Sequence, residues 1–378
     1  MKRNTFTFLI VITLILSGCQ NGVGDKKHKQ KSHKHKVENQ YAKKNHKNAK
    51  KLVEYKGEIH HVFFHPIISD PQKAFTDNKQ QAQGNYDWMV TVSEFKKAIQ
   101  QLHQNDYILI DPHDAYDLDS TPVKRKKLKL PKGKKPLILS MDDMNYYDYM
   151  QGHGYTERLA LNKNKETVAE KKNDEGKMEQ SKTDDAVPLL NDYVKKHPDF
   201  SYKGQKAVVG LTGYEGVLGY RTNELDNSHY KQRKKQAKDV VKSMKRDGWT
   251  FASHSYGHIN FEDSTDEQII KDTKRWQKEV EPIVGKTDLF IFPHGAQDRD
   301  SSSFKYMVDQ AGFRFMAGVG PDNFTSISKK DVYQDRVAID GLNLHQFKYK
   351  LKPFLKPDEV YSEEDRQYYK GNKNYEAE

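Results

Sequence analysis

Short apolar segments alternate with longer amphipathic ones along most of this chain, and this alternation restricts its fold more than any other feature. The apolar segments have the length of buried strands, and the longer ones repeat apolar residues at helical spacing, as Phe95, Ile99 and Leu102 do. Alternating strands and helices build a mainly parallel sheet, so we predict an α/β fold. The predicted strands span residues 60–67, 107–110, 136–141, 206–211, 249–253, 288–292, 313–317 and 336–339, and the predicted helices span 92–104, 188–197, 223–247, 266–284 and 304–312.

The first residues, 1–18, have the pattern of a secretory leader. Lys2 and Arg3 precede an apolar run that is too short to span a bilayer. The run ends in Leu16-Ser17-Gly18-Cys19, which resembles a bacterial lipobox, and Cys19 is the only cysteine of the chain. We therefore expect a lipoprotein, acylated on Cys19 and held on the extracellular face of the bacterial cell membrane. A plain leader with a chance cysteine is the alternative.

The positive charge of the chain lies near its N-terminus and not on a folded face. Of the formal net charge of +11, residues 24–51 supply nine, through eleven Lys against Asp25 and Glu38, and the leader supplies the rest. The remainder is about neutral, so we expect no nucleic-acid partner. Residues 19–56 contain almost nothing apolar after the cysteine, which predicts a disordered Lys/His-rich tail that acts as a linker.

Side chains of metal-binding type follow two of the predicted strands. Asp142 and Asp143 come after the strand at 136–141, and His254 and His258 come after the strand at 249–253. In α/β barrels the active site lies at this end of the strands. Two imidazoles and one carboxylate suit Zn²⁺ and leave positions open for water, while the second carboxylate stays free to act as a base. A strand-end turn and ordinary histidines are the alternatives.

These segments resemble the polysaccharide deacetylases of carbohydrate esterase family 4. Ser140-Met141-Asp142-Asp143 is similar to the family's T-F-D-D, and the run from His254 to His258 fits H-[ST]-x-x-H. The run from Ile291 to Gly295 keeps the Pro and Gly of R-x-P-x-G but lacks its Arg, and Leu342-Asn343-Leu344-His345 is similar to a last motif, L-x-H. The resemblance covers about residues 60–350 and implies a deformed (β/α) barrel.

The resemblance also implies roles for single residues. Asp143, His254 and His258 would hold a divalent metal, with Zn²⁺ expected first and Co²⁺ or Ni²⁺ as alternatives. Asp142 would be the general base and His345 the catalytic acid. The oxyanion would lie against Pro293, His294 and Gly295, where a backbone N–H donates to it.

Three further positions are less defined by the sequence. In the family the missing Arg braces the base, and Arg221 and Asp340 are candidates to replace it. His65 follows a predicted strand and either packs there or lines the mouth of the site. Tyr214 lies in a Gly- and Tyr-rich loop that suits either a turn or the binding of a sugar ring.

We therefore expect a metal-dependent hydrolase that removes N-acetyl groups from an extracellular or cell-wall polysaccharide, of the peptidoglycan or poly-N-acetylglucosamine type. One alternative is a non-catalytic glycan-binding lipoprotein that retains the fold, although a pure binder has no need of Asp142. Another is a lipoprotein that captures metal with its Lys/His tail. The catalytic domain is expected at 57–356, with a polar insert at 157–187 that forms a loop, and a polar C-terminal tail at 357–378.

Overall fold

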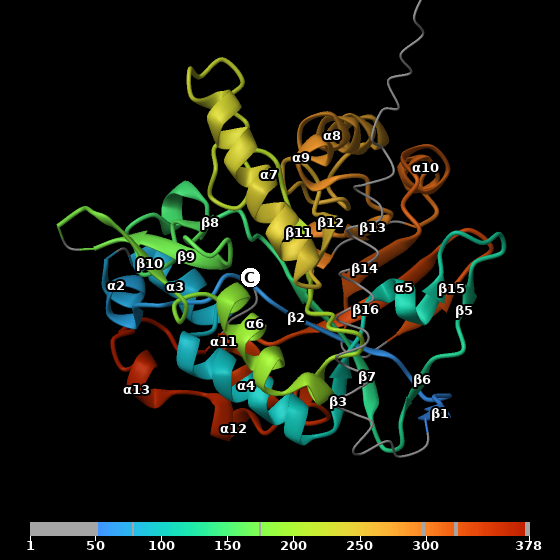
Figure 1. Cartoon of the computed structure of the whole chain (residues 1–378), viewed down its shortest axis with the longest axis horizontal. Coiled ribbons are helices and arrows are strands. Elements are labelled where there is room, and N and C mark those ends of the chain that lie inside the picture. The colour runs from blue at the N-terminus through green and yellow to red at the C-terminus, as the bar shows by residue number, and fades with distance from the viewer. Residues whose placement is uncertain (1–51, 78, 174, 296–298, 321–323, 375–378) are drawn as a thin grey trace, which may run out of the picture.

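The computed structural model describes residues 52–374, apart from 78, 174, 296–298 and 321–323 (Figure 1). The leader, Cys19 and nearly all of the predicted linker lie outside the described residues. Within the described part, no helix has both the length and the apolar character that a membrane crossing requires.

Seven parallel strands close into a barrel, as the resemblance implied (Figure 1). Each strand pairs with the next, and the last pairs again with the first. Two further strands extend this sheet: β3 (Tyr107–Leu109) pairs with β7, and β15 (Thr325–Ile327) pairs antiparallel with β16. The order around the barrel is β7 (Lys135–Met141), β11 (Val208–Leu211), β12 (Thr250–Ser253), β13 (Leu289–Ile291), β14 (Phe315–Val319), β16 (Val332–Ala338) and β2 (His60–Phe64).

The predicted helices lie outside the barrel and bury their apolar stripes against it. Helix α4 begins at a capping box, in which Thr91 accepts from the Glu94 N–H and the Glu94 side chain accepts from the Thr91 N–H. Its buried face is Phe95, Ile99 and Leu102, as the spacing predicted. The outer elements are α4 (Val92–Gln104), α6 (Ala186–Lys196), α7 (Tyr230–Arg246), α8 (Asp266–Glu279), α9 (Glu281–Val284), α10 (Ser302–Tyr306) and the π-helical turn η5 (Met307–Ala311).

The inside of the barrel changes from apolar at its floor to polar at its mouth. Side chains two residues apart on a strand share a face, so Ile138, Ser140 and Asp142 all point inward from β7 and its end. Ile138 belongs to the apolar floor, where it packs in one cluster with residues such as Phe315. Ser140 and Asp142 instead contact Arg336 of β16, which is not adjacent to β7, so this contact crosses the interior.

The structure corrects the prediction for the polar insert at 157–187. Its residues form a separate three-stranded antiparallel sheet of β8 (Arg158–Leu161), β9 (Thr167–Lys172) and β10 (Met178–Ser181), and not a loop. Figure 1 shows this sheet apart from the barrel strands. One face of this sheet packs against the rest of the protein and the other faces water, so Leu159 and Ala169 are fully buried.

The predicted linker is shorter than expected, and the polar C-terminal segment contains two short helices. Leu52–Glu54 forms β1, which pairs with β6 (Lys129–Pro131), so the linker does not extend to residue 56. The segment from 357 forms α12 (Pro357–Val360) and α13 (Glu363–Arg366). Arg366 is completely buried and pairs with Glu94 of α4 at 2.7 Å, which fixes the C-terminal segment to the barrel's outer layer.

Candidate metal and catalytic site

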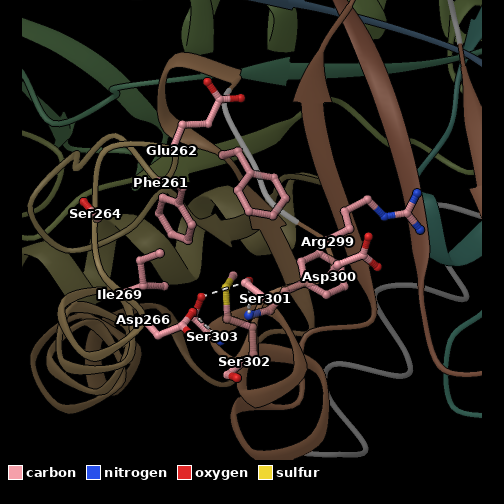
Figure 2. Close-up of a pocket in the computed structure, with 13 residues that line it drawn as sticks. Phe261, Glu262, Ser264, Asp266, Ile269, Arg299, Asp300, Ser301, Ser302 and Ser303 are labelled. Carbon is pink, nitrogen blue, oxygen red and sulfur yellow. Dashed lines mark hydrogen bonds between the residues drawn. The ribbon is translucent and has the colours of Figure 1, made fainter.

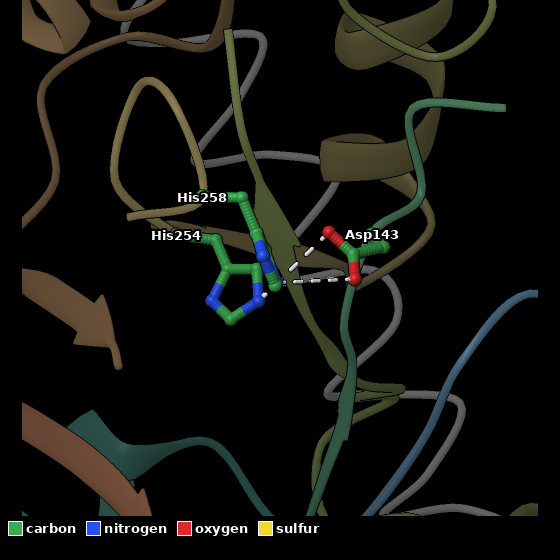
Figure 3. Close-up of side chains that lie close together, drawn as sticks. All are labelled: Asp143, His254 and His258. Atoms are coloured by element: carbon green, nitrogen blue, oxygen red, sulfur yellow. Dashed lines mark ion pairs between the residues drawn. The ribbon is translucent and has the colours of Figure 1, made fainter. Parts of the chain in front are cut away.

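Asp143, His254 and His258 come together at the mouth of the barrel (Figure 3). Their candidate ligand atoms all lie within 4.8 Å of one another. The Asp143 carboxylate is 3.9 Å from the His254 Nε2 and 3.5 Å from the His258 Nε2. Burial opposes the ionisation of Asp143, but the two imidazoles hold the pKa of its carboxyl below the usual range. The three residues predicted from the sequence thus form one candidate metal site.

Left-handed backbone turns direct these side chains into the site. Asp143 has a φ of 55°, which breaks the alternation of β7 and turns its carboxylate toward the two histidines. Ser255, His258 and His294 have φ values of 55°, 52° and 58°. A residue with a Cβ in this region costs roughly 1–2 kcal/mol, and such costs concentrate at functional sites. Asp272 of α8 supports the loop, since its carboxylate accepts from the Tyr256 and Gly257 N–H groups at 2.6 and 2.7 Å.

The donor set fits a divalent metal such as zinc. The His254 Nδ1 is 2.9 Å from the Ile291 carbonyl oxygen. A carbonyl can only accept, so Nδ1 carries the hydrogen and the lone pair of Nε2 faces the Asp143 side. Metal-bound histidines are oriented by this kind of hydrogen bond. Two imidazoles and a carboxylate leave coordination positions for water and substrate.

Asp142 is held apart from this cluster by a buried ion pair. The Arg336 guanidinium donates to the Asp142 Oδ1 at 2.7 Å, and the two side chains are 1% and 3% exposed. Burial raises the pKa of Asp142, but the charge and hydrogen bond of Arg336, together with His254 and His65, outweigh burial and bring it to about 2. Asp142 is therefore a carboxylate at any physiological pH.

The sequence did not identify Arg336 as the brace of the base. Of the two candidates, Arg221 instead joins two loops, donating to Asp148 and to the Tyr146 and Glu215 carbonyls. Asp340 caps α11 (Gly341–His345), where it accepts from the Asn343 N–H at 2.7 Å. The available signal is Arg336 itself, a charged residue within a predicted strand. In the structure it also donates to the Gly318 carbonyl and to Ser140.

His345 does not belong to this site, which corrects the prediction of the catalytic acid. It ends α11 and its ring packs edge-on against Tyr86 and Tyr361, with centroids 6.3 and 5.5 Å apart. His65, which directly follows β2, lies at the mouth instead. Its charge would act on Asp142, Asp143 and His258, and its Nδ1 is 3.1 Å from the Trp88 carbonyl oxygen.

The remaining predicted residues lie next to the cluster. Pro293–Gly295 forms a short turn, η4, directly after β13, and the His294 ring packs on His258 with centroids 4.6 Å apart. Gly295 has a φ of 73°, and a Cβ there would lie 2.5 Å from Val319, so only glycine fits. Tyr214 stacks on Tyr147, whose hydroxyl donates to the Asp143 Oδ1 at 2.5 Å.

A pocket of about 710 Å³ lies elsewhere, between α8, α10 and the loop that follows His258 (Figure 2). Its lining is mainly polar and includes Glu262, Asp266 and Arg299. None of the residues predicted for the metal or the base lines it. The candidate metal site therefore lies at the barrel mouth and not in this pocket.

Comparison with known proteins agrees with the type of site. Residues 221–316 match the family model of polysaccharide deacetylases, a stretch that includes both histidines of the cluster and ends before Arg336. No curated protein sequence matches the chain.

The chain is similar in fold to solved structures that include the following two proteins. The Streptococcus pyogenes deacetylase PplD in complex with acetate has 13% identity and a TM-score of 0.45, over 81% of this chain and 100% of that one. IcaB from Ammonifex degensii has 12% identity and a TM-score of 0.41, over 76% and 94%.

Proposed function

We propose that this protein is a divalent-metal-dependent hydrolase that removes N-acetyl groups from an extracellular or cell-wall polysaccharide, of the peptidoglycan or poly-N-acetylglucosamine type. The observation that carries the proposal is the separation of two adjacent carboxylates. Asp143 faces His254 and His258, whereas Asp142 is paired with Arg336 at 2.7 Å. A protein that only bound metal or glycan would have no use for a second ionised carboxylate here. The family match over 221–316 supports the same chemistry.

Asp143, His254 and His258 would hold the cation, which when bound polarises the acetyl carbonyl and lowers the pKa of water toward ~7. Asp142 accepts a proton from the attacking water as the water oxygen bonds to the carbonyl carbon. Arg336 keeps the Asp142 carboxylate charged and in place. A backbone N–H in the turn at His294 donates to the oxyanion that develops on the carbonyl oxygen.

His65 is the proposed catalytic acid. Its Nδ1 is held by the Trp88 carbonyl, so Nε2 is the nitrogen that exchanges a proton with the substrate. His65 gives this proton to the amide nitrogen as the C–N bond breaks. Acetate leaves, and a free amine remains on the sugar.

The test is acetate release by the purified protein from chitooligosaccharide, poly-N-acetylglucosamine and peptidoglycan fragments. We expect chelation to abolish the release and Zn²⁺, Co²⁺ or Ni²⁺ to restore it. In Asp142→Asn the rate should fall by about 10²–10⁴-fold, because the base is lost while the metal ligands remain. Metal content measured on the same sample is the control. Bound metal and bound glycan without acetate would leave only the glycan-binding alternative.

We also propose that acylated Cys19 holds the enzyme on the extracellular face of the bacterial cell membrane, with residues 20–51 as a spacer. The support is the lipobox-like run that ends at the chain's single cysteine. Cys19→Ser should move the protein from the membrane fraction to the soluble fraction, measured by fractionation and immunoblotting. A Cys19→Ser variant that stays with the membrane would contradict the tether.

A further inference from the structure

Three tyrosine rings form a stack at the edge of the metal site. Tyr147 is the middle ring, with its centroid 5.9 Å from Tyr149 and 5.1 Å from Tyr214, at interplanar angles of 24° and 16°. The middle ring is buried at 3% exposure, whereas Tyr149 and Tyr214 are 43% and 36% exposed. The stack therefore presents an aromatic surface to solvent on both sides of a buried ring.

The middle ring of this stack also contacts the metal site directly. The Tyr147 hydroxyl donates to the Asp143 Oδ1 at 2.5 Å, and its oxygen accepts from the Thr212 hydroxyl at 2.8 Å. A carboxylate that binds metal is oriented by hydrogen bonds of this kind, and removing them usually costs 10–100-fold in metal affinity. Tyr147 is thus placed to fix the Asp143 carboxylate.

The loops that carry the outer rings are fastened to each other. The Arg221 guanidinium donates to Asp148 and the Tyr146 carbonyl on one loop and to the Glu215 carbonyl on the other. The Glu215 carboxylate accepts from the Asp148 N–H at 2.6 Å. Because five contacts of this kind hold the two loops, the aromatic surface is formed before any ligand binds.

Exposed aromatic residues are present at this mouth. In the part of the chain that the structure describes, five aromatic side chains are exposed, and Tyr149, Tyr214 and Trp88 are three of them. The Trp88 carbonyl holds the Nδ1 of His65, so Trp88 borders the site as well. Hexosamine rings with equatorial substituents have flat apolar faces, and aromatic rings bind such faces without needing charge.

We propose that the Tyr149–Tyr147–Tyr214 stack is a binding site for a neutral chain of equatorially substituted hexosamine rings, and that Tyr147 positions Asp143 for metal binding. Two exposed rings on either side of a buried one suit an oligosaccharide better than a single sugar. The three-tyrosine stack would then both bind the glycan and orient a ligand of the metal. The identity of the glycan rests on the proposed function.

The test measures metal and glycan binding separately by calorimetry. Apo protein is titrated with Zn²⁺, and zinc-loaded Asp142→Asn, which should not turn over, is titrated with chitohexaose or with N-acetylglucosamine. Tyr147→Phe keeps the ring but removes the hydroxyl, so we expect 10–100-fold weaker Zn²⁺ binding with chitohexaose binding nearly unchanged at saturating zinc. Thr212→Val removes the hydroxyl that donates to Tyr147 and should also weaken Zn²⁺ binding.

The outer rings should give the opposite result. Tyr149→Ala and Tyr214→Ala are expected to weaken chitohexaose binding by about 2–10-fold each and to leave Zn²⁺ affinity unchanged. Tyr214→Phe retains the ring and should restore glycan binding. Tyr349→Ala removes a tyrosine that is 63% exposed and packs on Phe347, so it is the matched control and should change neither.

Unchanged Zn²⁺ affinity in Tyr147→Phe would overturn the positioning role, and unchanged chitohexaose affinity in both alanine variants would overturn the glycan site. Failure of the proposed function has a different signature. In that case the wild type binds zinc and chitohexaose with the expected dependence on the tyrosines but releases no acetate, and the stack stands as a glycan-binding site. If both alanine variants release acetate at the wild-type rate, the proposed enzymatic function stands and the glycan-binding role of the stack is wrong.

Discussion

The two ends of the barrel use the same two side-chain types, histidine and aspartate, for different purposes. At the mouth, His254 faces Asp143 with one ring nitrogen and the Ile291 carbonyl with the other. At the floor, beside the start of β13, His113 has a carboxylate on each ring nitrogen. Its Nδ1 is 2.5 Å from Asp111 and its Nε2 is 2.9 Å from Asp288.

The pKa values of a floor histidine and a mouth histidine shift in opposite directions. Burial lowers the pKa of His113, but its two carboxylates outweigh burial and raise the pKa to about 10, so the ring is a cation at neutral pH. Burial lowers the pKa of His258 even though Asp143 lies beside it. A neutral imidazole binds a metal and an imidazolium does not. The mouth is therefore suited to a metal. At the floor, His113 instead joins Asp111 and Asp288 through two ion pairs.

The largest expected effect concerns the two histidines that compete for the role of acid at the mouth. His65→Gln should lower kcat for acetate release by about 10²–10⁴-fold, because the leaving amine loses its proton donor. His345→Gln should change kcat by less than about twofold, since His345 packs against Tyr86 and Tyr361 away from the ligands. Zinc content and kcat are measured for both variants. A large loss in His345→Gln with full activity in His65→Gln would reverse the assignment.

The next effect concerns the buried ion pair that separates the two carboxylates. Removing one partner of such a pair costs about 3–5 kcal/mol, so Arg336→Gln should lower the free energy of unfolding by that amount in urea. Without the Arg336 charge, burial is left to raise the pKa of Asp142, which is about 2 in the native protein. The acid limb of the pH–rate profile should then move to higher pH.

Arg336→Lys is the matched control for this prediction. It keeps the positive charge but lacks the guanidinium, whose several N–H groups donate to Asp142, Ser140 and the Gly318 carbonyl. We expect a smaller loss of stability and a smaller movement of the acid limb than in Arg336→Gln. An acid limb that stays in place in both variants would mean that Arg336 does not tune the base.

Those features of the mouth that depend on short stretches of chain could be predicted from the sequence. The apolar run at 136–141 corresponds to β7, and the period of two along a strand places Ser140 and Asp142 on one face. The resemblance grouped Asp143, His254 and His258, and these three residues do come together. Each of these features depends on a short stretch of chain.

Contacts made by closing the barrel could not be predicted in this way. Arg336 and Asp142 are 194 residues apart, and no periodicity reveals which strands become neighbours across the closed sheet. The predicted last motif depends on only two residue types, the leucine and the histidine of L-x-H. The family's motif ends a strand, whereas here Asp340 caps a helix that ends at His345. The insert at 157–187 was judged by its polarity, although polar strands with one buried face are common in antiparallel sheets.

The smallest expected effect concerns the floor, where His113→Gln should lower stability without affecting catalysis. The folded pKa of His113 is about 10, above the unfolded value of ~6.5, so its stabilising contribution is complete below pH ~6.5 and is lost as the pH rises through 10. Because the ring is 44% exposed, we expect only about 0.2–1 kcal/mol at pH 7. Thermal unfolding at pH 7 and at pH 10.5 measures this, and the difference in Tm between wild type and variant should shrink at the higher pH. A difference that grows with pH would mean that His113 is neutral in the folded state, and the contrast between floor and mouth would disappear.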